Sequence, residues 1–153
     1  FAYQYSTPKD PLFKEVEEMV NWQMKFPGGI VAQCTTSYQI QTSKRYRVFG
    51  DEGWINVENA YAYVGQELTQ TSASDEQETE RKINIKHINQ FAQEMDYFSD
   101  CIINDTEPYT SGEVGLQDHL IMEAIYESAA KNKPISLSNR LPKKLKRGPE
   151  PKL

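Results

Sequence analysis

Histidine and carboxylate side chains are the first candidates for acid–base chemistry in this chain. Gln117, Asp118 and His119 are consecutive, in a stretch that we expect to be helical. Neighbouring residues on a helix point in different directions, so Asp118 and His119 do not face each other. A nucleophilic mechanism would also need a positioned nucleophile, and the spacing identifies none. We therefore interpret this triplet as structural, and His87, in a charged segment, as a surface histidine.

The acidic side chains predict neither an acid–base pair nor a metal site. Glu17 and Glu18 are adjacent in a stretch that we expect to be extended, where successive side chains point to opposite faces. A second acidic cluster consists of Asp75, Glu76, Glu78 and Glu80. Its sequence lacks the pattern of a calcium-binding loop, and we interpret it as a solvated loop.

The cysteines and tyrosines could take part in binding, but their positions do not identify a site. Cys34 and Cys101 are far apart, and no Cys-x-x-Cys pattern occurs, so we expect two small buried thiols and no metal. The nine tyrosines offer hydroxyls and ring faces of the kind that hold sugars. Tyrosine is equally common in protein interfaces and half-buried sheets, and composition alone favours those roles.

Bulk properties exclude several classes of protein. A chain of 153 residues suggests one domain, and a net charge of −5 argues against a general nucleic-acid binder. No apolar run approaches the roughly 20 residues that span a membrane. The start, Phe1-Ala2-Tyr3-Gln4-Tyr5, has neither a Met nor the features of a signal peptide, so we expect a piece cut from a longer protein.

Alternating apolar residues predict an antiparallel hairpin near the start of the chain. After the turn residues Pro27-Gly28-Gly29, a second run repeats the even-position pattern of the first. The first run is Val16, Val20, Trp22, Met24 and Phe26, and the second is Ile30, Ala32, Cys34, Thr36 and Tyr38. Further strands are expected at 45–50, 54–57 and 60–68, with a short closing strand at 82–85. We expect the polar stretch from Thr69 to Glu80 to be an exposed loop.

Helical periodicity follows from Asn89 onward. An apolar stripe of Phe91, Met95, Phe98, Cys101 and Ile102 predicts one helix. Ser111 is a suitable N-cap for a second helix, which Pro134 cannot continue. We expect the stripe of the first helix to cover Trp22 on the dry face of the sheet.

This order of strands followed by helices predicts an α+β fold: an open, mainly antiparallel β-sheet with helices packed on one face. We expect residues 1–10 to be a linker or a remnant of an upstream region, and residues 11–136 to be the domain. Residues 137–153 should form a basic, proline-containing tail. Its run Lys143-Lys144-Leu145-Lys146-Arg147 is expected to be solvated and disordered.

Several motifs resemble one family of enzymes. Leu12–Glu17 followed by Trp22–Phe26, and then Tyr46–Gly53, are similar to segments of bacterial glucose-fructose oxidoreductase. The most specific part comes later in the chain and consists of Asn89-Gln90-Phe91, Pro108, Ser111–Asp118, Ile125–Ala129 and Lys133-Pro134-Ile135. This order resembles the end of the Gfo/Idh/MocA oxidoreductases, with glucose-fructose oxidoreductase as the nearest branch, over roughly residues 10 to 136.

The resemblance implies a two-domain enzyme of the dihydrodipicolinate-reductase-like type. A Rossmann domain would hold NAD or NADP, and the C-terminal domain would shape the sugar pocket and build homo-oligomers through its sheet. The whole enzyme would transfer a hydride between the nicotinamide and a sugar carbon. The family's Glu-Lys-Pro and Asp-x-Gly-x-His/Tyr motifs are absent from this chain, so we assign no catalytic residue and expect the chain alone to bind no cofactor.

Tyr126 is the one site residue that the resemblance suggests, because a tyrosine at this point of the last long helix is close to the nicotinamide in the family. The alternative is that Tyr126 packs at the domain boundary. The substrate-binding residues stay unknown. A non-catalytic interaction or assembly module built on the same sheet is the alternative function. We expect no nucleic-acid or membrane partner and a cytoplasmic location, with the periplasm as the alternative.

Overall fold

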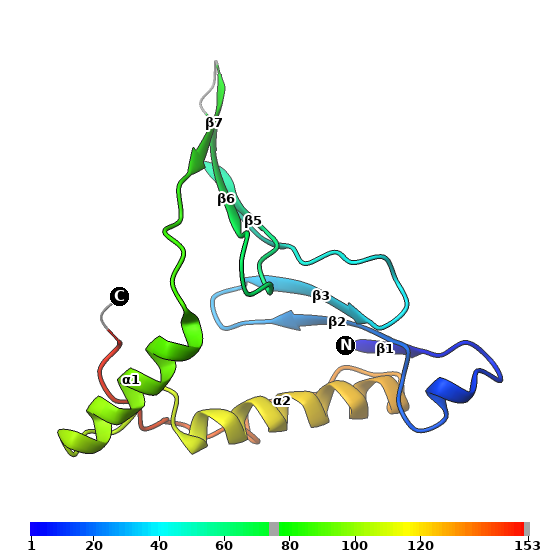
Figure 1. Cartoon of the computed structure of the whole chain (residues 1–153). Coiled ribbons are helices and arrows are strands. Elements are labelled where there is room, and N and C mark those ends of the chain that lie inside the picture. Colours follow the sequence, from blue (N-terminus) through cyan, green and yellow to red (C-terminus); the bar gives the residue numbers. More distant parts are fainter. Residues whose placement is uncertain (74–76, 152–153) are drawn as a thin grey trace. The chain divides into compact units, whose positions relative to one another are not determined.

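The computed structural model describes residues 1–73 and 77–151, and Figure 1 shows its elements. The chain separates into two compact units. The first unit combines Phe1–Ile40 with Phe98–Leu153, and the second is Gln41–Tyr97. The acidic residues Asp75 and Glu76, which we expected in a solvated loop, lie outside the described residues.

The first unit contains an antiparallel sheet with the order β1-β2-β3, formed by Ala2–Tyr5, Met19–Lys25 and Val31–Ser37. The predicted hairpin is confirmed as β2 and β3. Its turn needs Gly28 and Gly29, whose φ angles of 87° and 93° are costly for any residue with a Cβ. The alternation extended the predicted first strand too far, because residues 14–18 form a loop and β2 begins only at Met19.

The expected linker over residues 1–10 is wrong for β1, which pairs with β2 in the register Ala2 to Trp22. The helix α2, Gly112–Lys131, packs against β1 (Figure 1). The Ala2 N–H donates to Ser128 Oγ at 3.0 Å, and that hydroxyl donates to the carbonyl of Lys133 at 2.7 Å. Ala2, Ala124 and Ser128 are all buried, so small side chains let the helix approach the edge strand closely.

Within the first unit, Phe98 and Ile102 of the predicted cover for Trp22 are exposed. The helix α1, Gln90–Ile103, forms as expected, but Cys101 is the one buried residue of its stripe, and Phe91, Met95, Phe98 and Ile102 are 50 to 71 % exposed. Trp22 is partly buried beside Ala2 and near Val20, which is 4 % exposed, in the sheet on which α2 packs. Periodicity identifies an apolar stripe without identifying what the stripe meets.

The second unit contains a separate antiparallel sheet with the order β4-β5-β6-β7. Its strands are Tyr46–Gly50, Gly53–Glu58, Glu67–Ala73 and Glu78–Ile83. The α+β class and the antiparallel pairing are therefore confirmed, but the described strands form two sheets where one was expected.

Two predictions in this unit are wrong. The expected strand at 60–68 is mostly a turn region, bounded by the left-handed residues Asn59 and Gly65. The expected loop at 69–80 contains most of β6 and the start of β7, and the closing strand ends at Ile83. Thr69 and Thr71 explain this result, because β-branched residues favour a strand even where the side chains are polar.

Both helix starts follow the sequence, although the capping differs between them. The side chain of Asn89 accepts hydrogen bonds from the N–H groups of Phe91 and Ala92 at 3.1 and 3.2 Å. Ser111 precedes α2 as predicted, but its hydroxyl makes no cap and donates to the carbonyl of Lys146 at 2.9 Å. The end of α2 is set by Asn132, which adopts the left-handed conformation with φ 50°.

The expectation of a disordered basic tail is wrong for its central part, which returns along α2 to the start of that helix. The Lys146 N–H donates to Glu113 Oε2 at 3.0 Å, and the Gly148 N–H donates to the Pro108 carbonyl at 3.2 Å. The Arg147 guanidinium lies 5.0 Å from the ring centre of Tyr109. The proline content and charge of this segment gave no sign of these backbone contacts.

We predict that Trp22→Ala lowers the free energy of unfolding by about 3 kcal/mol, the low end for a large aromatic residue because Trp22 is only partly buried. Lys25→Ala is the matched control, since Lys25 is exposed at the end of the same strand. Thermal melts followed by circular dichroism measure both. Equal midpoints for the two variants would show that Trp22 does not stabilise the sheet.

We predict that Gly148→Ala releases the tail from α2, because a Cβ at residue 148 would overlap the backbone carbonyl of Glu107. Amide hydrogen exchange should then become faster at residues 146 and 148, because the N–H groups of both residues are hydrogen bonded in the native chain. Gly115→Ala is the control, because a Cβ there meets nothing within 4 Å. Unchanged exchange at residue 146 in the Gly148→Ala chain would contradict the observed docking of the tail.

Candidate functional site

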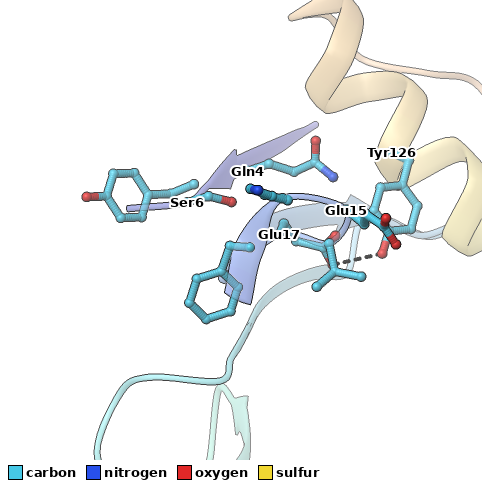
Figure 2. Close-up of a pocket in the computed structure, with 9 residues that line it drawn as sticks. Gln4, Ser6, Glu15, Glu17 and Tyr126 are labelled. Atoms are coloured by element: carbon cyan, nitrogen blue, oxygen red, sulfur yellow. Dashed lines mark hydrogen bonds between the residues drawn. The ribbon is translucent and has the colours of Figure 1, made fainter. Parts of the chain in front are cut away.

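An open pocket of about 440 Å³ lies in the first unit, between β1, the segment that leads into β2, and α2. The segment begins with a short 3-10 helix, Pro11–Phe13. The pocket is lined by Gln4, Tyr5, Ser6, Phe13, Lys14, Glu15, Val16, Glu17 and Tyr126. Most of these side chains are polar, so the pocket is suited to a ligand that makes hydrogen bonds (Figure 2).

A hydrogen bond joins two of the side chains that line this pocket, Tyr126 and Glu17. The Tyr126 hydroxyl donates to Glu17 Oε1 at 2.8 Å, and Figure 2 shows the phenol reaching from α2 toward the loop. Tyr126 remains 46 % exposed. The hydrogen bond to Glu17 raises the pKa of the phenol above its usual value, with smaller contributions from burial and from the negative charge of Glu17. The phenol therefore stays protonated at neutral pH.

The loop that carries Glu17 is anchored by the next residue. Glu18 Oε2 accepts hydrogen bonds from the N–H and the hydroxyl of Thr7, at 2.8 and 2.7 Å. The Glu18 N–H donates to the Tyr5 carbonyl at 3.0 Å, and the Tyr38 N–H donates to the Glu18 carbonyl at 3.0 Å. The two neighbouring glutamates thus have different partners: Glu18 fixes the loop, and Glu17 faces Tyr126.

Glu127, the residue after Tyr126, does not line the pocket and forms ion pairs with Lys131 and Arg140. Hydrogen bonds from Arg140 and Lys131 lower the pKa of its carboxyl to about 2. The contact with Arg140 ties the start of the tail to α2, and the contact with Lys131 is an ion pair one helical turn apart. Glu127 consequently keeps its negative charge until the pH falls to about 2.

The other residues considered from the sequence do not line this pocket. Asp118, His119 and His87 are exposed side chains. Cys101 is buried as expected, whereas Cys34 is only partly buried, and that burial raises the pKa of its thiol. In the described part of the chain, no three His, Cys, Asp or Glu residues are grouped to hold a metal ion. Neither of the described α-helices combines the length and the apolar composition that a membrane span requires.

Glu17 is the site residue that the sequence did not reveal. It stands 109 residues from Tyr126 in the chain, and the alternation of the neighbouring residues suggested a strand. Only the position of α2 against β1 brings the two side chains together. The polar character of the segment from Lys14 to Glu18 was the one available sign of a loop.

Comparisons with known proteins agree with this fold. The family description "Oxidoreductase family, C-terminal alpha/beta domain", of the Gfo/Idh/MocA group, matches residues 1–137. The chain is 33 % identical over 116 residues to D-xylose 1-dehydrogenase [NADP(+)] from Haloarcula marismortui, a match that covers 76 % of this chain and 31 % of the relative.

A solved structure gives the same result. The aldose-aldose oxidoreductase from Caulobacter crescentus, crystallised with glycerol, is 34 % identical and superposes with a TM-score of 0.77. The match covers 86 % of this chain and 38 % of that protein. The chain thus spans about a third of the length of these two proteins. The predicted family is confirmed: the chain belongs to the Gfo/Idh/MocA oxidoreductases and contains the C-terminal α/β domain of that family.

Proposed function

We propose that this domain forms the substrate-side part of an NADP-dependent sugar oxidoreductase. The observation that carries this proposal is the pair of relatives at 33 and 34 % identity, whose names describe an NADP-linked xylose dehydrogenase and an aldose-aldose oxidoreductase. The reaction would transfer a hydride between a nicotinamide and a sugar carbon, and the cofactor would supply that chemistry. A cytoplasmic location stays a prediction.

We further propose that Tyr126 contacts the nicotinamide end of the cofactor. Its phenol is half exposed in a polar pocket and held in one direction by Glu17. The pocket fits a carboxamide better than a phosphate, because its one cationic side chain is Lys14 and two carboxylates, Glu15 and Glu17, line the same pocket. The phosphates would need a glycine-rich loop and a helix N-terminus on a Rossmann domain.

The test uses the whole polypeptide that joins this domain to a nucleotide-binding domain. We expect it to form NADPH when an aldose such as D-xylose is added, measured by absorbance. Tyr126→Phe should weaken NADP binding about three- to tenfold, the equivalent of one hydrogen bond. Tyr61→Phe is the control, since Tyr61 is 68 % exposed in the second unit. The chain alone should show no micromolar NADP binding by calorimetry.

Each part of this experiment has an outcome that contradicts the proposal. No NADPH from a panel of aldoses would argue against the sugar oxidoreductase activity. Equal NADP affinity in the native polypeptide and the Tyr126→Phe variant would remove Tyr126 from the cofactor site. A micromolar dissociation constant for the chain alone would show that this domain holds the cofactor by itself.

We also propose that the domain associates with a copy of itself through the first sheet. The strand face opposite Trp22 carries the uncharged side chains of Asn21, Gln23, Gln33, Thr35 and Ser37. Gln23 and Gln33 are exposed and lie opposite each other in β2 and β3. Uncharged amides on an accessible face allow two copies to approach without like-charge repulsion.

We predict a dimer at micromolar concentration in sedimentation equilibrium. The double variant Gln23→Glu, Gln33→Glu should weaken the dimer at least tenfold, because a twofold contact would bring four added carboxylates together. Gln41→Glu is the control, because it adds a carboxylate at an exposed loop position away from this face. A monomer at every concentration, or equal dimer affinity in all variants, would contradict association through this face.

A further inference from the structure

The hydrogen of the Tyr126 hydroxyl is already committed within the protein. A tyrosine hydroxyl carries one hydrogen to donate and lone pairs that accept. In this structure the hydrogen points to Glu17 Oε1, 2.8 Å away. A carboxylate is a strong acceptor, and hydrogen bonds to an ionised group are about twice as strong as those between neutral groups. What remains of the hydroxyl for a ligand is its capacity to accept a hydrogen bond.

The position of the Glu17 carboxylate is set by structure on both sides of it in the chain. On one side is the short helix Pro11–Phe13, which Asp10 caps by accepting from the Leu12 N–H at 3.0 Å. On the other side is Glu18, which is tied to Thr7 through two hydrogen bonds. Because both flanks are anchored, Glu17 is held at the rim of the pocket, where Figure 2 shows it beside Tyr126.

We infer that Glu17 is a positioning residue: it holds the Tyr126 hydroxyl in one orientation and makes its oxygen an acceptor toward the ligand. The group that meets Tyr126 must then be a hydrogen-bond donor. A carboxamide N–H and a sugar hydroxyl share this property, whereas a carbonyl or a phosphate oxygen lacks it. The inference rests on the proposed function only for the choice of the carboxamide as that donor.

The groups around Tyr126 make the effect of Glu17 separable from that of its neighbours. The ionisable side chains that line the same pocket are Tyr5, Lys14 and Glu15, and Tyr38 also acts on the phenol through its charge. Glu17 accepts the hydrogen bond from Tyr126, and Glu15 does not. Glu15 is thus a matched control for Glu17: both carboxylates line the pocket, and the hydrogen bond to Tyr126 distinguishes them.

The first experiment measures the pKa of Tyr126 in the chain labelled with ¹³C at the tyrosine Cζ, assigned with Tyr126→Phe. Glu17→Gln replaces the carboxylate that accepts the phenol hydrogen, which is the main cause of the raised pKa, and also removes its charge, so the pKa of Tyr126 should fall toward 10. Glu15→Gln should change it much less. Thermal melts confirm that both variants are folded. An equal Tyr126 pKa in the native chain and Glu17→Gln would overturn the inference.

The second experiment tests whether Glu17 acts through Tyr126. NADP affinity is measured in the whole polypeptide for Glu17→Ala, Tyr126→Phe and the double variant. A positioning role predicts that Glu17→Ala weakens binding about threefold in the native background and has no effect in the Tyr126→Phe background. Equal effects in both backgrounds would overturn the inference. If Tyr126→Phe leaves NADP affinity unchanged, the proposed contact between Tyr126 and the cofactor is contradicted, and the pKa measurement alone decides the role of Glu17.

Discussion

The contact between the edge strand β1 and helix α2 is the constraint on which the first unit depends. An edge strand presents N–H and C=O groups that need a partner. Here the Ala2 N–H donates a hydrogen bond to the Ser128 hydroxyl, and that hydroxyl donates a hydrogen bond to the Lys133 carbonyl. One buried hydroxyl therefore links the sheet, the helix and the turn that ends the helix. Leaving such groups unpaired would cost about 1–3 kcal/mol for each.

The candidate site follows from this contact. Because Ala2, Ala124 and Ser128 are small, the helix comes close to the sheet, and Tyr126 on another face of the same helix reaches the loop before β2. The site is thus a product of packing between distant segments. A larger residue at either of these helix positions would move Tyr126 away from Glu17 while leaving both side chains intact.

Sequence reasoning succeeded where the signal was local and failed where it depended on distant partners. The hairpin around Gly28 and the helix after Ser111 follow from alternation, turn residues and capping positions. The polar strands β6 and β7 were missed, because their threonines and charged residues give no apolar alternation. The Glu17 contact was beyond reach for a different reason, since no local pattern connects residues separated by 109 positions.

The tail lies largely beyond the region shared with the family, which ends at residue 137. Its backbone nevertheless occupies the surface near Ser111 and Glu113. A peptide tethered this closely competes as though it were present at millimolar concentration. Any separate molecule that bound the same end of α2 would have to displace the tail. Its measured affinity would therefore be lower than its affinity for the same surface without the tail.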